Sequence, residues 1–166
     1  MIETARSRID WAKFRELEAR RHREFFLPQY ESLGMSVVED IFDDVKTNAY
    51  DVVVIGLDGV WKRIDEKARG REYGDFLVEV MQCLRTGKHG WLYKDVDIIF
   101  YASWANEEDV APSSAYLVEA GRLKDFVIMN MDDLKSVTSE KGYGLSWNKV
   151  VAWRDLEFHG IASRVL

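Results

Sequence analysis

Few residues in this sequence can cross-link or interrupt the chain. Cys83 is the only cysteine, and two prolines occur among 166 residues. One cysteine excludes an intrachain disulfide, as is expected of a protein in a reducing cytoplasm. No apolar run approaches the ~20 residues that span a bilayer, and the first residues lack the apolar core of a signal peptide. We therefore expect a cytoplasmic protein with no membrane association.

The short motifs that identify many enzymes are also missing. The spacing of His22, His89 and His159 is not that of zinc ligands. With a single cysteine, we do not expect a structural zinc site. The G-x-G-x-x-G and Walker motifs of phosphate-binding loops do not occur. The G-x-S-x-G motif that carries a nucleophilic serine is also absent from the sequence. Function must therefore come from side chains that the fold brings together.

What the sequence does contain is enough apolar material for a core. It is 47% hydrophobic and 13% aromatic, which is unlike the composition of disordered chains. The length predicts one domain over residues 1–166. The net charge of −6 argues against a protein that coats nucleic acid through bulk electrostatics. A local basic cluster nevertheless occurs: Lys62, Arg63, Lys67, Arg69 and Arg71.

Hydrophobic spacing predicts an α/β fold, in which helices flank a mixed central sheet of about four or five strands. We expect a helix over about 8–27 that ends at Pro28, a core over about 35–130 and a C-terminal segment over 131–166. Within these bounds we predict a short helix in 35–46, strands at 51–56, 60–68, 75–81, 96–101 and 115–118, a helix at 122–129, and a strand near 150–153. The early strands are expected to pair as a meander.

The most informative segment is the hairpin predicted from 51–56 and 60–68. Side chains alternate along a strand, so Asp65 and Lys67 should point to one face and Glu66 to the other. Folding the hairpin places Asp51 near Asp65 and Lys67. Two carboxylates and an ammonium at one sheet edge suit a divalent cation together with a water or phosphate. The alternative is a surface salt bridge at the edge of a hairpin.

Further acids are candidates for the same site. Glu79 would lie on the metal-binding face if the 75–81 strand pairs beside the Asp65 arm; otherwise it is an exposed strand residue. Asp40 and Asp44 share a face of the helix expected in 35–46, by their i, i+4 spacing. The alternative for these two acids is a solvated helix surface.

The arrangement resembles the PD-(D/E)XK nuclease superfamily, which has the restriction-endonuclease-like fold. Asp51, thirteen intervening residues and then Asp65-Glu66-Lys67 carry the resemblance. The segments Ile64–Arg69, Tyr73–Glu79, Gly90-Trp91 and Asp97–Tyr101 are similar to uncharacterised phage and bacterial members. The resemblance covers about 35–130, and Tyr50 stands where the family usually has proline before the first Asp.

The resemblance implies a metal-dependent nuclease that hydrolyses phosphodiester bonds, with DNA as the favoured substrate. Asp51 and Asp65 would bind Mg²⁺ or Mn²⁺, Glu79 would add a carboxylate, and Lys67 would orient the attacking water. In several related nucleases an acid on the preceding helix also reaches the site, which would be Asp40 or Asp44 here. A homodimer or a protein partner would supply further DNA contacts.

Two other interpretations remain open from the sequence. The chain could keep this fold as a non-catalytic binding or regulatory module, in which the tryptophans and the acidic 95–140 region mark a protein interface. It could also be an unrelated α/β domain in which Asp-x-Lys is a coincidence. Metal dependence separates the first from an enzyme. An Asp51–Asp65 separation beyond about 8 Å would favour the second, because one hydrated cation could hardly bridge it.

Overall fold

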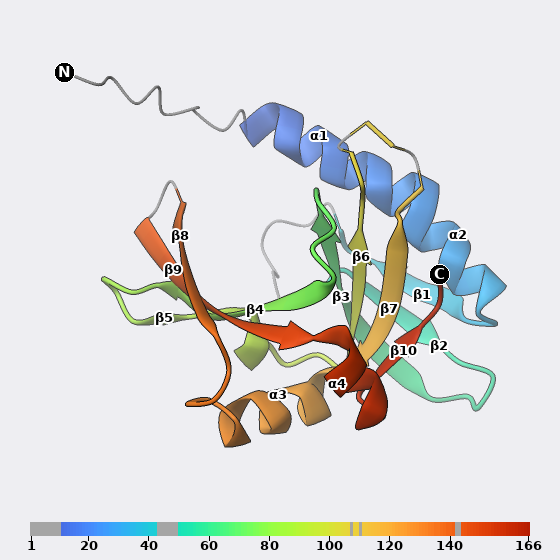
Figure 1. Ribbon diagram of the computed structural model, residues 1–166. Coiled ribbons are helices and arrows are strands. Elements are labelled where there is room, and N and C mark those ends of the chain that lie inside the picture. Colours follow the sequence, from blue (N-terminus) through green and yellow to red (C-terminus); the bar gives the residue numbers. More distant parts are fainter. Residues whose placement is uncertain (1–10, 43–49, 107, 110, 142–143) are drawn as a thin grey trace.

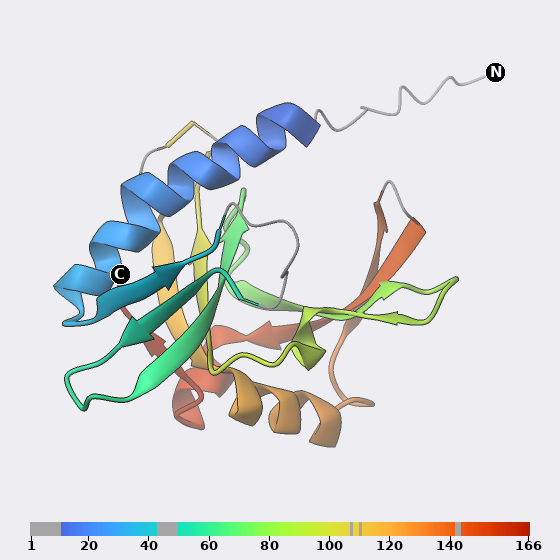
Figure 2. The ribbon, with the colours of Figure 1, turned by 180° about the vertical axis from the view of Figure 1, so that it is seen from behind.

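The computed structural model describes residues 11–42, 50–106, 108–109, 111–141 and 144–166, and its strands form two sheets. Sheet A has six strands in the order β1-β2-β3-β6-β7-β10, and sheet B has four in the order β5-β4-β9-β8. Figures 1 and 2 show the N-terminal helix lying across sheet A, while sheet B extends away from it. The predicted α/β class with a mixed sheet is confirmed, although that sheet is wider than expected.

The strand bounds set the frame for the site. Sheet A consists of β1 (Ser36–Asp40), β2 (Val52–Ile55), β3 (Trp61–Arg69), β6 (Ile98–Ser103), β7 (Ser114–Glu119) and β10 (Ala162–Arg164). Sheet B consists of β4 (Asp75–Cys83), β5 (Lys88–His89), β8 (Ser136–Lys141) and β9 (Gly144–Ala152). Strands β3 and β6 are parallel, and the other neighbouring strands in both sheets are antiparallel.

The sequence predicts that the N-terminal helix ends at Pro28, but the structure shows that it continues. Helix α1 (Trp11–Arg21) continues through a π-helical turn, η1 (His22–Phe26), into α2 (Leu27–Ser32). In the π turn the Leu27 amide donates to the His22 carbonyl, five residues back. Pro28 then lies in the first turn of α2, where a missing N–H breaks no helical hydrogen bond. The proline therefore starts a helical segment here.

The short helix predicted within 35–46 is wrong. Residues Ser36–Asp40 form β1, an edge strand antiparallel to β2. The apolar spacing in this segment fits a helix, but the β-branched Val37 and Val38 favour a strand once β2 offers backbone partners. Residues 43–46 of the predicted helix lie outside the described part of the chain.

The predicted hairpin is confirmed. Strands β2 and β3 are antiparallel, with Val52 opposite Ile64, and Gly59 takes a positive φ of 74° in the turn between them. The other edge of β3 pairs with β6, whose six residues are all buried. The 96–101 strand is thus central, as predicted from its apolar character.

The meander prediction fails after β3. Strand β4 was expected beside β3, but it pairs with β9 and β5 in sheet B. The predicted 115–118 strand and 122–129 helix correspond to β7 and α3 (Ala120–Met129), and the strand near 150–153 is the end of β9. Strands β8 and β10 and helix α4 (Trp153–Phe158) were not predicted.

Apolar side chains pack on both faces of sheet A. On one face Phe25, Phe26 and Tyr30 of the N-terminal helix contact Phe100 and Trp104. The other face joins sheet B, α3 and α4 in a second cluster. Sheet A is therefore the middle layer, and its strands present side chains to a packed environment on either side. No helix in the described ranges is long and apolar enough to cross a membrane.

The aromatic packing under the N-terminal helix predicts the effect of Phe26→Ala. Phe26 is 2% exposed and packs edge-on against Phe100. We expect the substitution to lower the free energy of unfolding by about 3–5 kcal/mol, because it leaves a cavity in a close-packed core. Urea denaturation would measure this. Phe158→Ala is the matched control, since Phe158 is 86% exposed, and it should change stability by less than about 0.5 kcal/mol. Equal effects of the two substitutions would contradict this packing.

Candidate functional site

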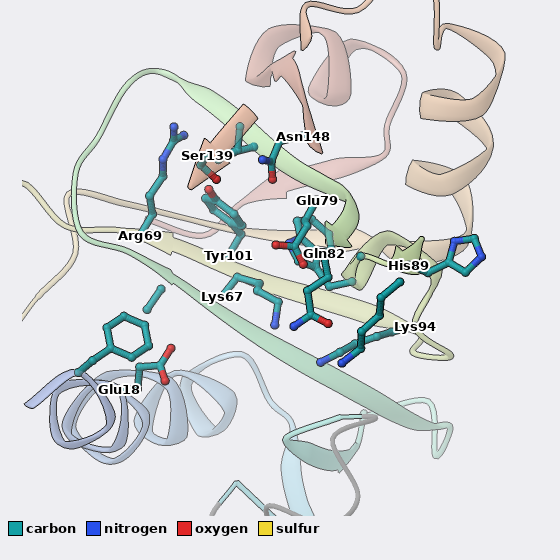
Figure 3. Close-up of a pocket in the computed structure, with 16 residues that line it drawn as sticks. Glu18, Lys67, Arg69, Glu79, Gln82, His89, Lys94, Tyr101, Ser139 and Asn148 are labelled. Atoms are coloured by element: carbon teal, nitrogen blue, oxygen red, sulfur yellow. The ribbon is translucent and has the colours of Figure 1, made fainter. Parts of the chain in front are cut away.

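Strand β3 presents its charged residues to two different environments. Ile64 and Glu66 point toward the N-terminal helix, where Ile64 belongs to the apolar cluster and Glu66 contacts His22 and Tyr30. Lys67 lines a cleft on the opposite side (Figure 3). The alternation predicted from the sequence, with Asp65 and Lys67 together and Glu66 apart, is therefore present.

Asp51 and Asp65 occupy facing positions on neighbouring strands. Asp51 precedes β2, and its amide continues the ladder by donating to the Ile64 carbonyl at 2.8 Å. The Glu66 amide donates to Asp51 Oδ2 at 2.6 Å, which fixes this carboxylate beside β3. Burial raises the pKa of Asp51, and the nearby charge of Asp65 raises it further. The structure thus brings together the two acids that the sequence singles out.

The Asp65 carboxylate lies between two ammonium groups. It is 1% exposed, with Lys67 Nζ 2.6 Å from Oδ2 and Lys94 Nζ 2.8 Å from Oδ1. The Lys67 contact is an ion pair without hydrogen-bond alignment, so the buried Oδ2 accepts no hydrogen bond from the described residues. Burial alone would lower the pKa of Lys67, but Asp65 and Asp51 outweigh it and raise that pKa. Lys67 therefore stays charged.

Two members of this site were missed by the sequence reasoning. Lys94 follows the 3₁₀ turn η2 (Trp91–Tyr93), and no local pattern connects it to Asp65. Glu18 comes from α1, and its pKa is raised by burial, opposed by the charge of Lys67 and reinforced by Asp51. Phe14 and Glu18 both line the cleft, and their i, i+4 spacing places them on one helix face. That shared face was the available signal for Glu18.

Glu79 lines the cleft from sheet B, whereas Asp65 is buried behind Lys67 and does not line the cleft. The cleft has a volume of about 700 Å³ and is bounded by α1, β3 and sheet B (Figure 3). Because β4 pairs with β9, Glu79 faces Asn148 in sheet B and lines the cleft from the opposite wall. No set of three or more His, Cys, Asp or Glu side chains within the described ranges has the geometry of a metal site. Glu79 thus reaches the same cleft by a different route from the one expected.

The acids proposed from the 35–46 segment do not join the cleft where the structure describes them. Asp40 accepts a hydrogen bond from the Phe42 amide at 3.2 Å, and its other oxygen lies 3.1 Å from His22 Nε2. It therefore belongs to the helix-covered face of sheet A. Asp44 lies outside the described residues.

A buried polar network supports β3 from beneath. Glu66 has two polar partners: His22 Nδ1 lies 2.8 Å from its Oε2, and the Tyr30 hydroxyl donates to its Oε1 at 2.8 Å. Both ring nitrogens of His22 face carboxylates, so the His22, Glu66 and Asp40 side chains together hold at least two protons in this arrangement. Burial raises the pKa of Glu66 to about 7, although His22 and Tyr30 oppose this shift. Burial by itself lowers the pKa of His22, but Glu66 and Asp40 raise it overall.

Asp51 and Asp65 fit a hard divalent cation. Mg²⁺ is often held by one or two carboxylates and keeps several waters, so a third protein carboxylate is not required. Asp65 Oδ2 lies 2.6 Å from the Lys67 ammonium, a contact that a bound cation would have to share or displace, and Asp51 has one oxygen fixed by the Glu66 amide. The chemistry of these donors is therefore that of Mg²⁺ or Mn²⁺ ligands.

Comparisons with protein-family models, with curated proteins and with solved structures give no match to this chain. The functional argument consequently depends on the geometry of the cleft and on the sequence resemblance.

The Glu66–His22 pair predicts an unusual dependence of stability on pH. Both pKa values are raised by folding, so the folded protein binds these protons more tightly than the unfolded chain. The stabilisation is present at low pH and is lost as pH rises through the folded pKa values. We expect the free energy of unfolding to fall by about 1–3 kcal/mol between about pH 5 and about pH 8.

Urea denaturation at several pH values would measure this dependence in the wild type and in Glu66→Gln. The amide keeps an acceptor for His22 but cannot titrate, so the slope should become flatter. Glu119→Gln, at an exposed position in β7, is the matched control and should keep the wild-type slope. An unchanged slope in Glu66→Gln would show that the pair does not control it.

Proposed function

We propose that the protein is a metal-dependent nuclease of the restriction-endonuclease-like class, which hydrolyses phosphodiester bonds in DNA. One observation carries the proposal: Asp51 faces Asp65 on the neighbouring strand, and Lys67 contacts Asp65 at the wall of a cleft. This is the constellation that the PD-(D/E)XK resemblance implies. It also makes coincidence a weaker explanation, because facing residues of antiparallel strands lie about 4.5–5.5 Å apart.

The residues of the chain divide the work of such a reaction. Asp51 and Asp65 would hold Mg²⁺ or Mn²⁺, which when bound makes water easier to deprotonate and neutralises phosphate charge. Lys67 is held charged by the two acids, and it would stabilise the negative charge that develops on the phosphate. Glu18 has a raised pKa and is suited to accept a proton from the attacking water.

Glu79 and Lys94 have other positions in this proposal. Glu79 belongs to the opposite wall, so we assign it to the surroundings of the substrate and not to the cation. Lys94 pairs with Asp65 Oδ1, and its ammonium competes with a cation for that carboxylate. A homodimer or a protein partner, which the negative net charge suggests, stays a prediction.

A second candidate function is a nucleic-acid-binding module without turnover. One observation favours it: Lys67 and Lys94 already balance the charge of Asp65, which lowers its attraction for a cation. The two candidates differ in whether a divalent metal binds and whether phosphodiester bonds are cut.

Cleavage of labelled linear, nicked, branched and single-stranded DNA with Mg²⁺ or Mn²⁺ tests the nuclease proposal. Wild type should cut at least one substrate. Asp65→Asn and Lys67→Met should each lower the rate by about 10²–10³-fold, since each removes charge from the reacting region. Asp97→Asn and Lys62→Met are the matched controls, because Asp97 pairs with Arg63 and Lys62 lies near the start of β3. Thermal melting would verify that every variant is folded.

Three outcomes would decide between the candidates. Metal-dependent cutting that is lost only in Asp65→Asn and Lys67→Met supports the nuclease. Cutting that persists in both variants places any active site elsewhere. DNA binding without cutting by wild type, and without Mn²⁺ binding in calorimetry, favours the binding module.

The ion pair between Lys94 and Asp65 predicts a gain of metal affinity on substitution. Lys94→Met removes an ammonium that lies 2.8 Å from Asp65 Oδ1 and would repel a nearby cation. We expect Mn²⁺ to bind about 10-fold more tightly in calorimetry, a modest share of the repulsion between two close charges. Lys124→Met, a control in α3, should leave Mn²⁺ affinity unchanged. Weaker binding in Lys94→Met would mean that Lys94 organises the cation site instead of competing with it.

A further inference from the structure

The wall of the cleft opposite Lys67 has a different chemistry from the Asp51–Asp65 side. It is built by sheet B, and beside the charged Glu79 and Lys88 it presents the carboxamides of Gln82 and Asn148 and the hydroxyl of Ser139 (Figure 3). The facing wall carries the ammonium groups of Lys67 and Lys94. One ligand that spans the cleft would therefore meet the ammonium groups of Lys67 and Lys94 at one end and several amide and hydroxyl groups at the other.

Asn148 has a fixed orientation in this wall. It is 3% exposed, and its Nδ2 donates to the Val137 carbonyl at 3.3 Å and to Ser146 Oγ at 3.1 Å. A carbonyl can only accept, so the nitrogen must face Val137 and both of its protons are used. Oδ1 accepts no hydrogen bond from the residues that the structure describes. The oxygen is not among the fully buried atoms that lack a partner, so it borders the cleft, where water or a ligand can donate to it.

The backbone holds this wall in place. Gly90, directly after β5, packs so closely on β4 that a Cβ there would collide with the Glu79 carbonyl. Its amide donates to the Val80 carbonyl at 2.8 Å, which ties the segment to β4. Trp91 follows and packs edge-on against Phe76 of the core. The groups that line the cleft are therefore positioned before any ligand binds.

The size of the cleft limits what can enter it. A volume of about 700 Å³ falls within the ~300–1,000 Å³ of sites that enclose one small molecule, and a DNA duplex does not fit in such a space. Asn148 Oδ1 can accept a hydrogen bond from an N–H or an O–H donor, and the N–H groups of a base are donors of this kind. Every base carries N–H groups on its pairing edge, and in a duplex those groups are already paired. A base that reaches Asn148 must therefore be unpaired.

We propose that the cleft binds one unpaired nucleotide of a DNA strand, with its phosphate toward Lys67 and Lys94 and the pairing edge of its base toward Asn148 and Gln82. The proposal rests on the proposed function for the placement of the phosphate beside Asp51 and Asp65. It adds the substrate class, a single-stranded segment or an extruded base. Because all four bases offer an N–H donor, the site selects for unpaired structure and little for sequence.

Fluorescence anisotropy of labelled oligonucleotides tests the proposal without turnover, in buffer that contains Ca²⁺ in place of Mg²⁺. The probes are a single-stranded DNA, the blunt duplex of the same sequence and the matching single-stranded RNA. We expect wild type to bind the single-stranded DNA at least about 10-fold more tightly than the duplex. Gln82→Ala and Asn148→Ala should each weaken single-strand binding about 3- to 10-fold and leave duplex binding unchanged. Gln29→Ala in α2 is the control and should match wild type.

The results separate this proposal from the nuclease itself. Equal binding of single strand and duplex, or unchanged single-strand binding in Gln82→Ala, overturns the nucleotide site even if DNA is cut. Tighter binding of the RNA overturns the assignment to DNA. Single-strand preference that falls in the variants supports the site even if wild type cuts nothing. If thermal melting shows that Asn148→Ala is unfolded, Gln82→Ala decides alone, since no hydrogen bond in the described structure depends on its side chain.

Discussion

Alternation along β3 is the constraint on which the rest of the structure depends. Successive side chains of this central strand point to opposite faces of sheet A, so a single residue step separates the cleft from the interior. Lys67 lines the cleft with the buried Asp65 paired behind it, while Ile64 and Glu66 pack beneath the N-terminal helix. A shift of the β2–β3 register by one residue would exchange these two sets. Burial of the apolar side chains of β3 under the N-terminal helix therefore also sets the position of the charged residues on the opposite face.

The two faces handle charge in different ways. On the cleft side, the buried Asp65 is balanced by the ammonium groups of Lys67 and Lys94, which line the cleft and can reach a ligand. Beneath the sheet, the described partners of Glu66 are the titratable His22 and the Tyr30 hydroxyl, and burial raises the pKa of Glu66 to about 7. On the cleft side of sheet A the acid and the two lysines are charged. On the side beneath the N-terminal helix, protons are shared between carboxylates and an imidazole. Both arrangements satisfy buried polar groups, but only the first presents charge to a cation or phosphate.

Sheet B forms a cleft over the charged face of β3. If β4 paired with β3 as a simple meander, Asp65 and Lys67 would lie on an open sheet surface. The departure of β4 into a second sheet instead places a wall opposite Lys67 that carries amide and hydroxyl groups beside the Glu79 carboxylate. That wall supplies hydrogen-bonding groups of a kind different from those on β3. This wall bounds the cleft and differs in chemistry from the wall formed by β3. The size of the cleft and the difference between its walls are the basis for inferring a substrate class.

The sequence by itself determined the hairpin, the alternation along β3 and the meeting of Asp51 with Asp65, because these follow from local strand periodicity and a short turn. Only the tertiary structure decided that β1 is a strand, that β4 leaves the meander, and that Glu18, Lys94 and Asn148 reach the cleft. Those outcomes depend on backbone partners and packing between segments far apart in the chain. Local propensity carries no information about such partners, since the energy that selects them appears only when the sheets and the helix assemble.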